Sequence, residues 1–187
     1  MTRVLIAGLG NMGLSHALAH HANPDAEIVG LVNRSGRVDH PELARYPAFD
    51  DFETALGETH PDLVVIATYT DSHADYACLA MDAGALVFVE KPLALTVAEA
   101  KRVVAKAVET DRKLVVGYIL RHHPSWVRRI EESRDLGGPF VFRLNLNQQS
   151  SGAAWDAHKA LMETTSPIGE CGVNDVDVLC RLTAAEA

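Results

Sequence analysis

The sequence predicts an α/β fold in which a doubly wound parallel sheet has helices on both faces. Short, β-branched apolar runs alternate with helical patterns along residues 1–118, which is typical of consecutive βαβ units. Most of these runs are continuously apolar, as expected for strands buried on both faces. The length of 187 residues allows one complete domain and at most part of another.

The elements of this fold can be placed along the chain from the periodicity of apolar residues. Strands are expected at residues 4–7, 27–32, 48–49, 63–67, 86–89 and 114–116. Helices are expected at residues 12–21, 41–46, 52–56, 72–83 and 97–110. The last of these carries valine and alanine on one stripe, which indicates one buried face.

A second domain is predicted to begin after the last of these strands. The pattern changes near Tyr118 to a polar helix and a Gly-Gly-Pro turn, so the predicted domains are residues 1–119 and 120–187. Polar residues alternate from Arg143 within residues 140–147, which predicts a half-exposed strand of an antiparallel sheet in an α/β substrate domain. One strand cannot form a stable sheet, so this domain is expected to be incomplete. Its unpaired edges predict a homo-oligomer.

Composition excludes several classes of partner. Seventeen Lys and Arg against 25 Asp and Glu give a net charge of −8, with no basic run for a nucleic acid. Three cysteines without a Cys-x-x-Cys spacing favour a reducing compartment. No apolar run suits a signal peptide or a membrane span, so we expect a cytoplasmic protein. We expect no metal, because the adjacent His122 and His123 would point apart on a helix.

The first chemical motif is Gly8-Leu9-Gly10-Asn11-Met12-Gly13, directly after the first strand. In this position Gly8 permits a tight turn, Gly10 lets the backbone approach a pyrophosphate, and Gly13 allows close packing of helix and strand. The following helix presents its positive dipole end to the phosphates. The motif therefore predicts a Rossmann-type dinucleotide site.

The end of the second strand indicates which dinucleotide is bound. An acidic residue here would hold the ribose hydroxyls of NAD, but this chain has Asn33, Arg34 and Ser35. Arg34 offers a fork of donors suited to a 2′-phosphate, so NADP is favoured over NAD. In the alternative reading Arg34 is simply solvated and NAD, or both dinucleotides, are used. Asp39 is a less well placed acid.

A charged pair, Glu90-Lys91, follows the apolar run 86–89 and precedes Pro92. Ligands bind at the carboxyl ends of strands in open α/β sheets, so a lysine here can bind a substrate hydroxyl or carry its proton. A surface salt bridge is the alternative.

Together with Thr68, His73, the run Val116-Gly117-Tyr118, Arg121 and Pro124, these motifs resemble the Gfo/Idh/MocA family of NAD(P)-dependent oxidoreductases. The resemblance implies that Lys91 is the catalytic lysine and that Thr68 and His73 lie near the nicotinamide. It also implies a Lys91-Pro92 bond that is often cis. The residues assigned to the cofactor, by the motifs and by this resemblance together, are Gly8, Gly10, Asn11, Met12, Gly13, Asn33, Arg34, Ser35, Thr68, His73, Glu90 and Lys91.

The chain departs from the family at the acid/base pair. The family has an Asp and a His four apart on one helix, where this chain has Glu170 and Asn174. Glu170 keeps a catalytic carboxylate, but Asn174 cannot exchange a proton near neutral pH. Either Lys91 carries the proton while Asn174 binds the substrate oxygen, or His158 replaces the missing histidine. The substrate residues implied are Lys91, Arg121, Glu170 and Asn174.

The expected function is hydride transfer between NADP(H), or NAD, and a hydroxyl or carbonyl carbon of a sugar- or cyclitol-like substrate. The alternative is a non-catalytic dinucleotide-binding protein, either regulatory or truncated. A third reading is that the chain is a fragment, because by family standards most of the second domain is missing.

Overall fold

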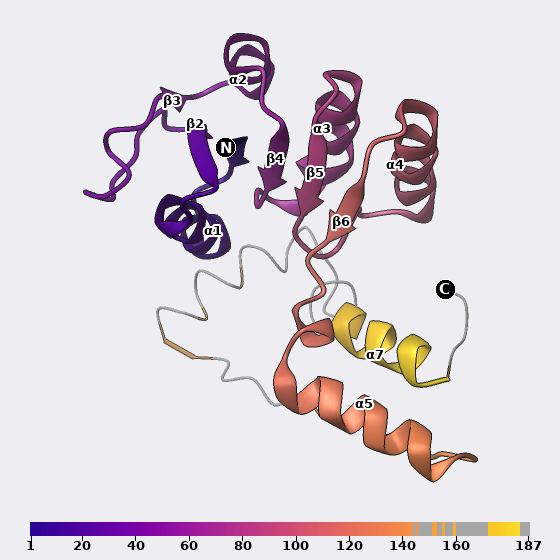
Figure 1. The fold of residues 1–187 in the computed structure, drawn as a ribbon. Coiled ribbons are helices and arrows are strands. Elements are labelled where there is room, and N and C mark those ends of the chain that lie inside the picture. Colours follow the sequence, from indigo (N-terminus) through magenta and orange to yellow (C-terminus); the bar gives the residue numbers. More distant parts are fainter. Residues whose placement is uncertain (144, 146–150, 153–154, 156–158, 160–171, 184–187) are drawn as a thin grey trace. The chain divides into compact units, whose positions relative to one another are not determined.

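The computed structural model describes residues 1–143, 145, 151–152, 155, 159 and 172–183. The chain divides into two compact units, residues 1–117 and residues 118–187. The first unit contains a sheet and four helices, and the described part of the second contains helices (Figure 1).

Six parallel strands form the sheet of the first unit, in the order β3-β2-β1-β4-β5-β6 (Figure 1). The order reverses direction beside β1, so that β1 lies between β2 and β4. This point of reversal is where open α/β sheets bind ligands. The parallel sheet and its helices confirm the predicted α/β class. The strands are β1 (Thr2–Ala7), β2 (Ala26–Val32), β3 (Ala48–Phe49), β4 (Leu63–Ile66), β5 (Leu86–Val89) and β6 (Leu114–Val116).

Each helix of the first unit follows a strand and returns the chain for the next. The four helices are α1 (Asn11–Ala22), α2 (Phe52–Thr59), α3 (Thr70–Asp82) and α4 (Val97–Thr110). The Asp51 side chain caps α2 by accepting from Thr54 N, and Thr96 and Glu99 form a reciprocal capping box at α4. Such caps satisfy backbone N–H groups that the helix leaves unpaired, which is why these two starts were predictable.

The core of the first unit lies on both faces of the sheet because successive strand residues point to opposite sides. Along β1, Leu5 and Ala7 pack on the face that α2, α3 and α4 cover, whereas Val4 and Ile6 pack on the face of α1. The two helical layers are visible in Figure 1. Burial on both faces explains the continuously apolar strands.

The helix predicted over residues 41–46 is wrong, since these residues form turns. Leu43 N donates to His40 O, and Tyr46 N donates to Leu43 O. Both hydrogen bonds span three residues. The segment begins with Pro41 and is followed by Pro47, and it is too short to build a regular α-helix.

The second unit begins with a short 3-10 helix, η1 (Ile119–Arg121), followed by α5 (Pro124–Leu136), and α7 (Val173–Thr183) comes later in the chain. Ile130 of α5 packs against Val178 and Leu182 of α7. The strand expected over residues 140–147 is not present at residues 140–143, which form no regular structure. A strand needs a hydrogen-bonded neighbour, and the described part of this unit contains none. Residues 144, 146 and 147 lie outside the described residues.

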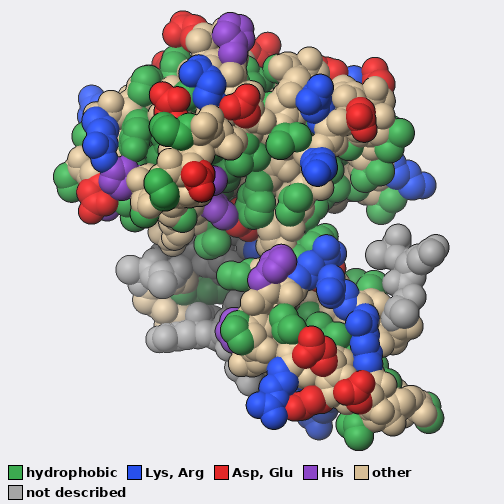
Figure 2. All heavy atoms as spheres, viewed as in Figure 1, with side chains coloured by type: hydrophobic (Ala, Val, Ile, Leu, Met, Phe, Trp, Pro, Cys, Tyr) green, Lys and Arg blue, Asp and Glu red, His purple; other side chains and the backbone are tan. Residues whose placement is uncertain are grey.

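The surface of the first unit carries charges of both signs. On the face shown in Figure 2, Lys and Arg side chains lie among Asp and Glu side chains. Within the described ranges, no helix is both long and apolar enough to cross a membrane.

Candidate functional site

The glycine turn between β1 and α1 is shaped by two close backbone approaches. Gly8 has a φ of +90°, and a Cβ there would lie 2.5 Å from Ala67 O at the end of β4. A Cβ at Gly13 would lie 1.9 Å from Gly8 O, so the helix packs directly on the turn. Both positions therefore require glycine for the fold itself.

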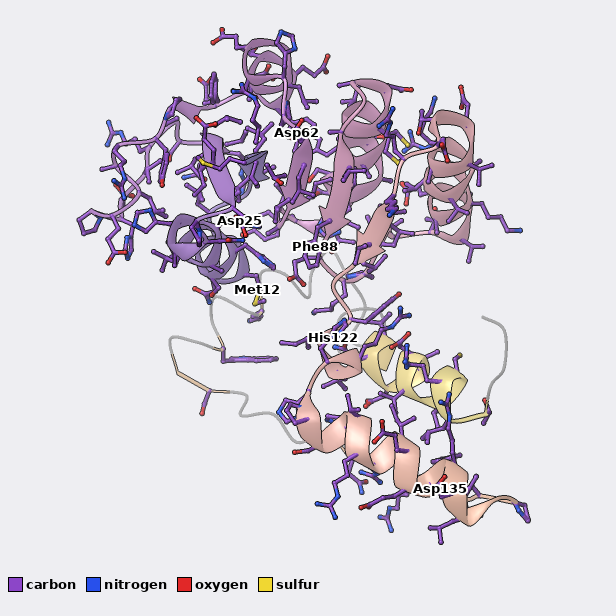
Figure 3. All side chains as sticks on the ribbon, viewed as in Figure 1. Met12, Asp25, Asp62, Phe88, His122 and Asp135 are labelled. Carbon is purple, nitrogen blue, oxygen red and sulfur yellow. The ribbon has the colours of Figure 1, made fainter. Side chains whose placement is uncertain are left out.

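Gly10 differs from these two glycines, because a Cβ there would meet no heavy atom within 4 Å. Gly10 is the N-cap of α1, no side chain caps the helix, and its first turn contains no acidic residue. The positive end of the helix dipole thus faces open space without a competing carboxylate. This arrangement fits the pyrophosphate of a dinucleotide, and Met12 lies beside it at the carboxyl-terminal end of the sheet (Figure 3).

The end of β2 turns sharply at the residues predicted to read the ribose. Asn33 Nδ2 donates to Ser35 Oγ at 2.9 Å and to Arg37 O at 3.0 Å. The Arg34 guanidinium lies 5.1 Å from the centre of the Tyr69 ring, a distance typical of a cation–π contact. The turn therefore presents a guanidinium and a hydroxyl, and no carboxylate, directly after the strand.

The loop after β4 is tied to the loop after β5 by a buried histidine. His73 is 1% exposed. Its Nδ1 lies 2.8 Å from Pro92 O, and its Nε2 lies 3.2 Å from Thr68 O. A carbonyl can only accept, so a neutral imidazole serves one of these contacts and a protonated one serves both. The Thr68 hydroxyl also contacts Ser72 Oγ at 2.7 Å.

Glu90, Lys91 and Pro92 follow β5 directly, and the Lys91-Pro92 bond is cis. Glu90 is 9% exposed, whereas Lys91 is half-buried. The Glu90 carboxylate contacts His16 Nε2 at 2.8 Å through Oε1, and Oε2 accepts from Lys91 N at 3.3 Å. A lysine amine at this edge of the sheet can bind a hydroxyl oxygen or exchange its proton.

The second unit holds the remaining predicted residues. Arg121 makes a two-pronged ion pair with Asp177 of α7, with Nε donating to Oδ2 at 2.9 Å and Nη2 donating to Oδ1. Arg121 also lies 4.7 Å from the Tyr118 ring. Burial, with the Asp177 charge adding to it, raises the pKa of Tyr118. Much of the donor capacity of Arg121 is thus already used within its own unit.

Asn174 lies in the first turn of α7, and its buried Oδ1 has no hydrogen-bond partner among the described residues. A buried acceptor of this kind usually has a partner. Glu170 and His158 fall outside the described residues. In the ranges that the structure covers, no three His, Cys, Asp or Glu side chains are grouped as metal ligands.

The structure places three residues around these groups in roles that the sequence did not predict. His16 contacts Glu90 from 74 residues away, Asp177 engages Arg121, and Gly117 leaves room for the Glu90 carboxylate. No local pattern signals such pairs. In the sequence, each of them is recognisable only as a polar residue or a glycine that lies at the end of a helix or strand, or on one face of it.

Known proteins share both the sequence pattern and the fold of this chain. The model of an oxidoreductase family with an NAD-binding Rossmann fold matches residues 2–118. A 4-carboxy-2-hydroxymuconate-6-semialdehyde dehydrogenase from a Sphingobium species is 30% identical over 168 residues, which cover 83% of this chain and 53% of that protein. The scyllo-inositol 2-dehydrogenase (NAD(+)) of Bacillus subtilis is 29% identical over 192 residues, covering 98% and 54%.

A solved structure gives the same comparison in three dimensions. GenD2 from gentamicin A biosynthesis, in complex with NAD, is similar with a TM-score of 0.78 and 25% identity. The match covers 100% of this chain and 54% of that one. The chain thus spans about half the length of the curated relatives and of the solved structure that it matches.

Proposed function

Because this chain belongs to the Gfo/Idh/MocA family of NAD-binding oxidoreductases, we propose that it transfers a hydride between a nicotinamide dinucleotide and a hydroxyl- or carbonyl-bearing carbon. The proposed substrate is a sugar- or cyclitol-like polyol. This class is favoured because a relative of similar sequence is named as an inositol dehydrogenase. The observation that carries the dinucleotide part of the proposal is that a Cβ at Gly10, the N-cap of α1, would meet no heavy atom within 4 Å, and that no acidic residue lies in the first turn.

The residues of the first unit have distinct tasks in this reaction. Gly8, Gly10, Asn11, Met12 and Gly13 would hold the pyrophosphate at the dipole end of α1. When bound, the nicotinamide supplies or accepts the hydride. In the direction of oxidation the neutral Lys91 amine takes the proton of the substrate hydroxyl, and in the direction of reduction the ammonium returns it to the carbonyl oxygen.

We propose that Lys91 carries this proton because the position expected to hold a histidine is Asn174. An amide hydrogen-bonds a substrate oxygen but does not exchange a proton near neutral pH. The substrate roles of Glu170, Asn174 and Arg121 stay predictions from the resemblance. In the structure Arg121 is paired with Asp177 of α7, which uses part of its donor capacity.

NADP is the proposed dinucleotide, although the comparisons name NAD. The support is the turn after β2, where Arg34 and Ser35 are exposed and Asn33 stands where an acid would hold the ribose. Arg34→Ala should weaken NADPH binding about tenfold and NADH binding little, because only the former has a 2′-phosphate. Fluorescence titration measures both. Equal losses for the two dinucleotides would contradict the preference.

Turnover provides the test of the overall proposal. The protein is incubated with NADP or NAD and a panel of polyols, and reduced nicotinamide is followed by absorbance. Lys91→Ala should abolish the signal. Lys101→Ala, an exposed lysine on α4, is the matched control and should not. Activity that survives Lys91→Ala would contradict the role of this lysine.

A non-catalytic dinucleotide-binding protein is the second candidate, and Asn174 is the observation that favours it. This candidate predicts tight binding of the dinucleotide by fluorescence titration with no turnover of any polyol. Turnover of any polyol in the panel would exclude it.

A further inference from the structure

The arginine that follows β2 and the tyrosine that follows β4 are in contact. Arg34 lies two residues beyond the end of β2, and Tyr69 lies three residues beyond the end of β4. The Arg34 guanidinium is 5.1 Å from the centre of the Tyr69 ring. β1 pairs with β2 on one side and with β4 on the other. The contact therefore joins the two loops on either side of the strand that leads into the glycine turn.

The backbone of Tyr69 is fixed by the start of α3. Tyr69 is the N-cap of this helix, and its carbonyl oxygen accepts from Ser72 N at 3.1 Å and from Ser72 Oγ at 2.9 Å. The Ser72 hydroxyl also contacts Thr68 Oγ1 at 2.7 Å. The Tyr69 ring, which is 46% exposed, thus extends from an anchored helix end to the surface, where it can hold a flexible side chain.

A second tyrosine of α3 lies near the same guanidinium. Tyr76 follows Tyr69 by seven residues, about two helical turns, so the two side chains share one face of the helix. Burial raises the pKa of Tyr76, and the charges of Asp51 and Asp71 add to the rise. The Arg34 charge opposes it, which places the guanidinium near this second tyrosine. Two side chains of α3 thus lie near Arg34, and the Tyr69 ring is the one that contacts it.

The contact with Tyr69 leaves the hydrogen-bond donors of Arg34 available. An aromatic ring attracts a cation through its face, but it has no lone pairs for the five N–H groups of a guanidinium. Among the described residues Arg34 forms no ion pair. Arg121 differs, because it lies against the Tyr118 ring and is also paired with Asp177. Arg34 is therefore held in place by its surroundings while its N–H groups can still bind a phosphate.

We propose that Tyr69 is a positioning residue for recognition of the 2′-phosphate of NADP. Its ring holds the Arg34 guanidinium ready for the phosphate and so strengthens the preference for NADP without contacting the phosphate itself. An arginine that is already ordered loses less conformational entropy when its ligand binds. The inference rests on the proposed function for the binding of NADP through Arg34. It adds that the preference depends on an aromatic side chain from the loop after β4.

The test compares the binding of NADPH with that of NADH by fluorescence titration of the whole chain, with no substrate present. Tyr69→Leu removes the ring and keeps an apolar side chain, whereas Tyr69→Phe and Tyr69→Trp keep a ring. Arg34→Ala, alone and combined with Tyr69→Leu, completes a double-mutant cycle. Tyr46→Leu is the matched control, because it removes the ring that lies 5.5 Å from the Arg45 guanidinium, a pair of the same kind elsewhere in the first unit.

The loss of the ring should affect NADPH selectively. Tyr69→Leu should weaken NADPH binding about twofold to fivefold, the range that corresponds to an exposed cation–π contact, and NADH binding little. Tyr69→Phe and Tyr69→Trp should bind NADPH as the wild type does. In the double variant, Tyr69→Leu should have no effect beyond that of Arg34→Ala. Tyr46→Leu should leave both affinities unchanged.

Several results would overturn the inference. Wild-type or tighter NADPH binding by Tyr69→Leu would show that the ring does not help Arg34. Equal losses for NADPH and NADH, or a loss that persists without Arg34, would mean that the ring contacts the dinucleotide itself. A Tyr69→Phe variant as weak as Tyr69→Leu would assign the effect to the hydroxyl. Urea unfolding shows whether each variant folds, and Tyr69→Met takes the place of Tyr69→Leu if the latter does not.

Failure of the proposed function gives a different pattern. If Arg34→Ala weakens both dinucleotides equally, the NADP preference is refuted and the role of Tyr69 with it. If Arg34→Ala selectively weakens NADPH binding while Tyr69→Leu has no effect, the role of Tyr69 alone is refuted. Turnover is not needed for either comparison, so a protein that binds dinucleotides without catalysis would still decide the role of Tyr69.

Discussion

A single methyl group at Gly10 is expected to weaken dinucleotide binding while the fold stays intact. A Cβ there would have no heavy atom within 4 Å, and the φ of −69° and ψ of −171° suit any residue. The methyl group would occupy the space before the first turn of α1. Phosphate oxygens must enter that space to reach the backbone N–H groups.

The change in stability can be worked from two small opposing contributions. Glycine is a better N-cap than alanine, so Gly10→Ala costs about 0.5–1 kcal/mol at the helix start. Alanine also restricts the unfolded chain, which favours folding by about 0.4–1 kcal/mol. The free energy of unfolding should therefore change by less than about 0.5 kcal/mol. Affinity for the reduced dinucleotide should fall at least about tenfold, or about 1.4 kcal/mol.

Gly13→Ala is the matched control, because it adds the same methyl group three residues later but is expected to destabilise the fold. Its Cβ would lie 1.9 Å from Gly8 O and 2.7 Å from Gly8 C. Backbone must therefore move, and overpacking of this kind costs about 1–3 kcal/mol or more. This variant should lose both stability and binding.

Urea unfolding followed by circular dichroism measures the stabilities, and fluorescence titration with NADPH and NADH measures the affinities. We expect Gly10→Ala to be stable but to bind the dinucleotides weakly, and Gly13→Ala to be defective in both respects. Wild-type affinity in Gly10→Ala would refute the assignment of the phosphate site. Wild-type stability in Gly13→Ala would refute the tight packing of α1 on the turn.

Three further predictions concern stability and reactivity. Thr96→Ala removes the oxygen that accepts from Glu99 N at 3.2 Å and should lower the free energy of unfolding by about 1 kcal/mol in urea. Burial lowers the pKa of His20 in the folded protein. As the pH falls below about 6.5, His20 is therefore protonated more readily in the unfolded chain, and the free energy of unfolding declines. His20→Gln should flatten this decline in the urea midpoint between about pH 7 and about pH 5. Burial raises the pKa of the Cys78 thiol, so iodoacetamide should label it far more slowly in the folded than in the unfolded protein.

Each of these predictions has a clear contrary result. A Thr96→Ala variant as stable as the wild type would show that the capping box contributes nothing. If the urea midpoint of His20→Gln depends on pH as it does in the wild type, a group other than His20 takes up the proton. Equal labelling of Cys78 before and after unfolding would contradict its burial.

Local patterns predicted most of the first unit because each βαβ step is built from its own residues. The bounds of β3, β5, β6 and α4 match those expected from periodicity, since apolar runs and the capping box mark their ends. The failure at residues 41–46 has a local cause as well, because a short segment between prolines satisfies its backbone with turns. In the second unit, the strand expected at residues 140–143 is absent, because pairing depends on a neighbour that periodicity cannot supply.

In the candidate site, too, local features could be predicted from the sequence and long-range contacts could not. The glycine turn and the Glu90-Lys91-Pro92 segment could be read from the sequence, because the geometry that each requires is set by adjacent residues. The contact of His16 with Glu90 could not, since it joins residues 74 positions apart that meet only where α1 packs on the sheet beside Phe88. The ion pair of Arg121 with Asp177 is equally non-local.

The sequence by itself determined the α/β class, the glycine turn after β1 and the position of the lysine at the end of β5. These follow from hydrophobic periodicity and from the conformations open to glycine and proline, which act over a few residues. Only the tertiary structure decided what surrounds the Glu90 carboxylate next to that lysine. Helix packing brings His16 against it and the pairing of β5 with β6 brings Gly117 close, because residues far apart in the sequence meet only when the elements that carry them pack together.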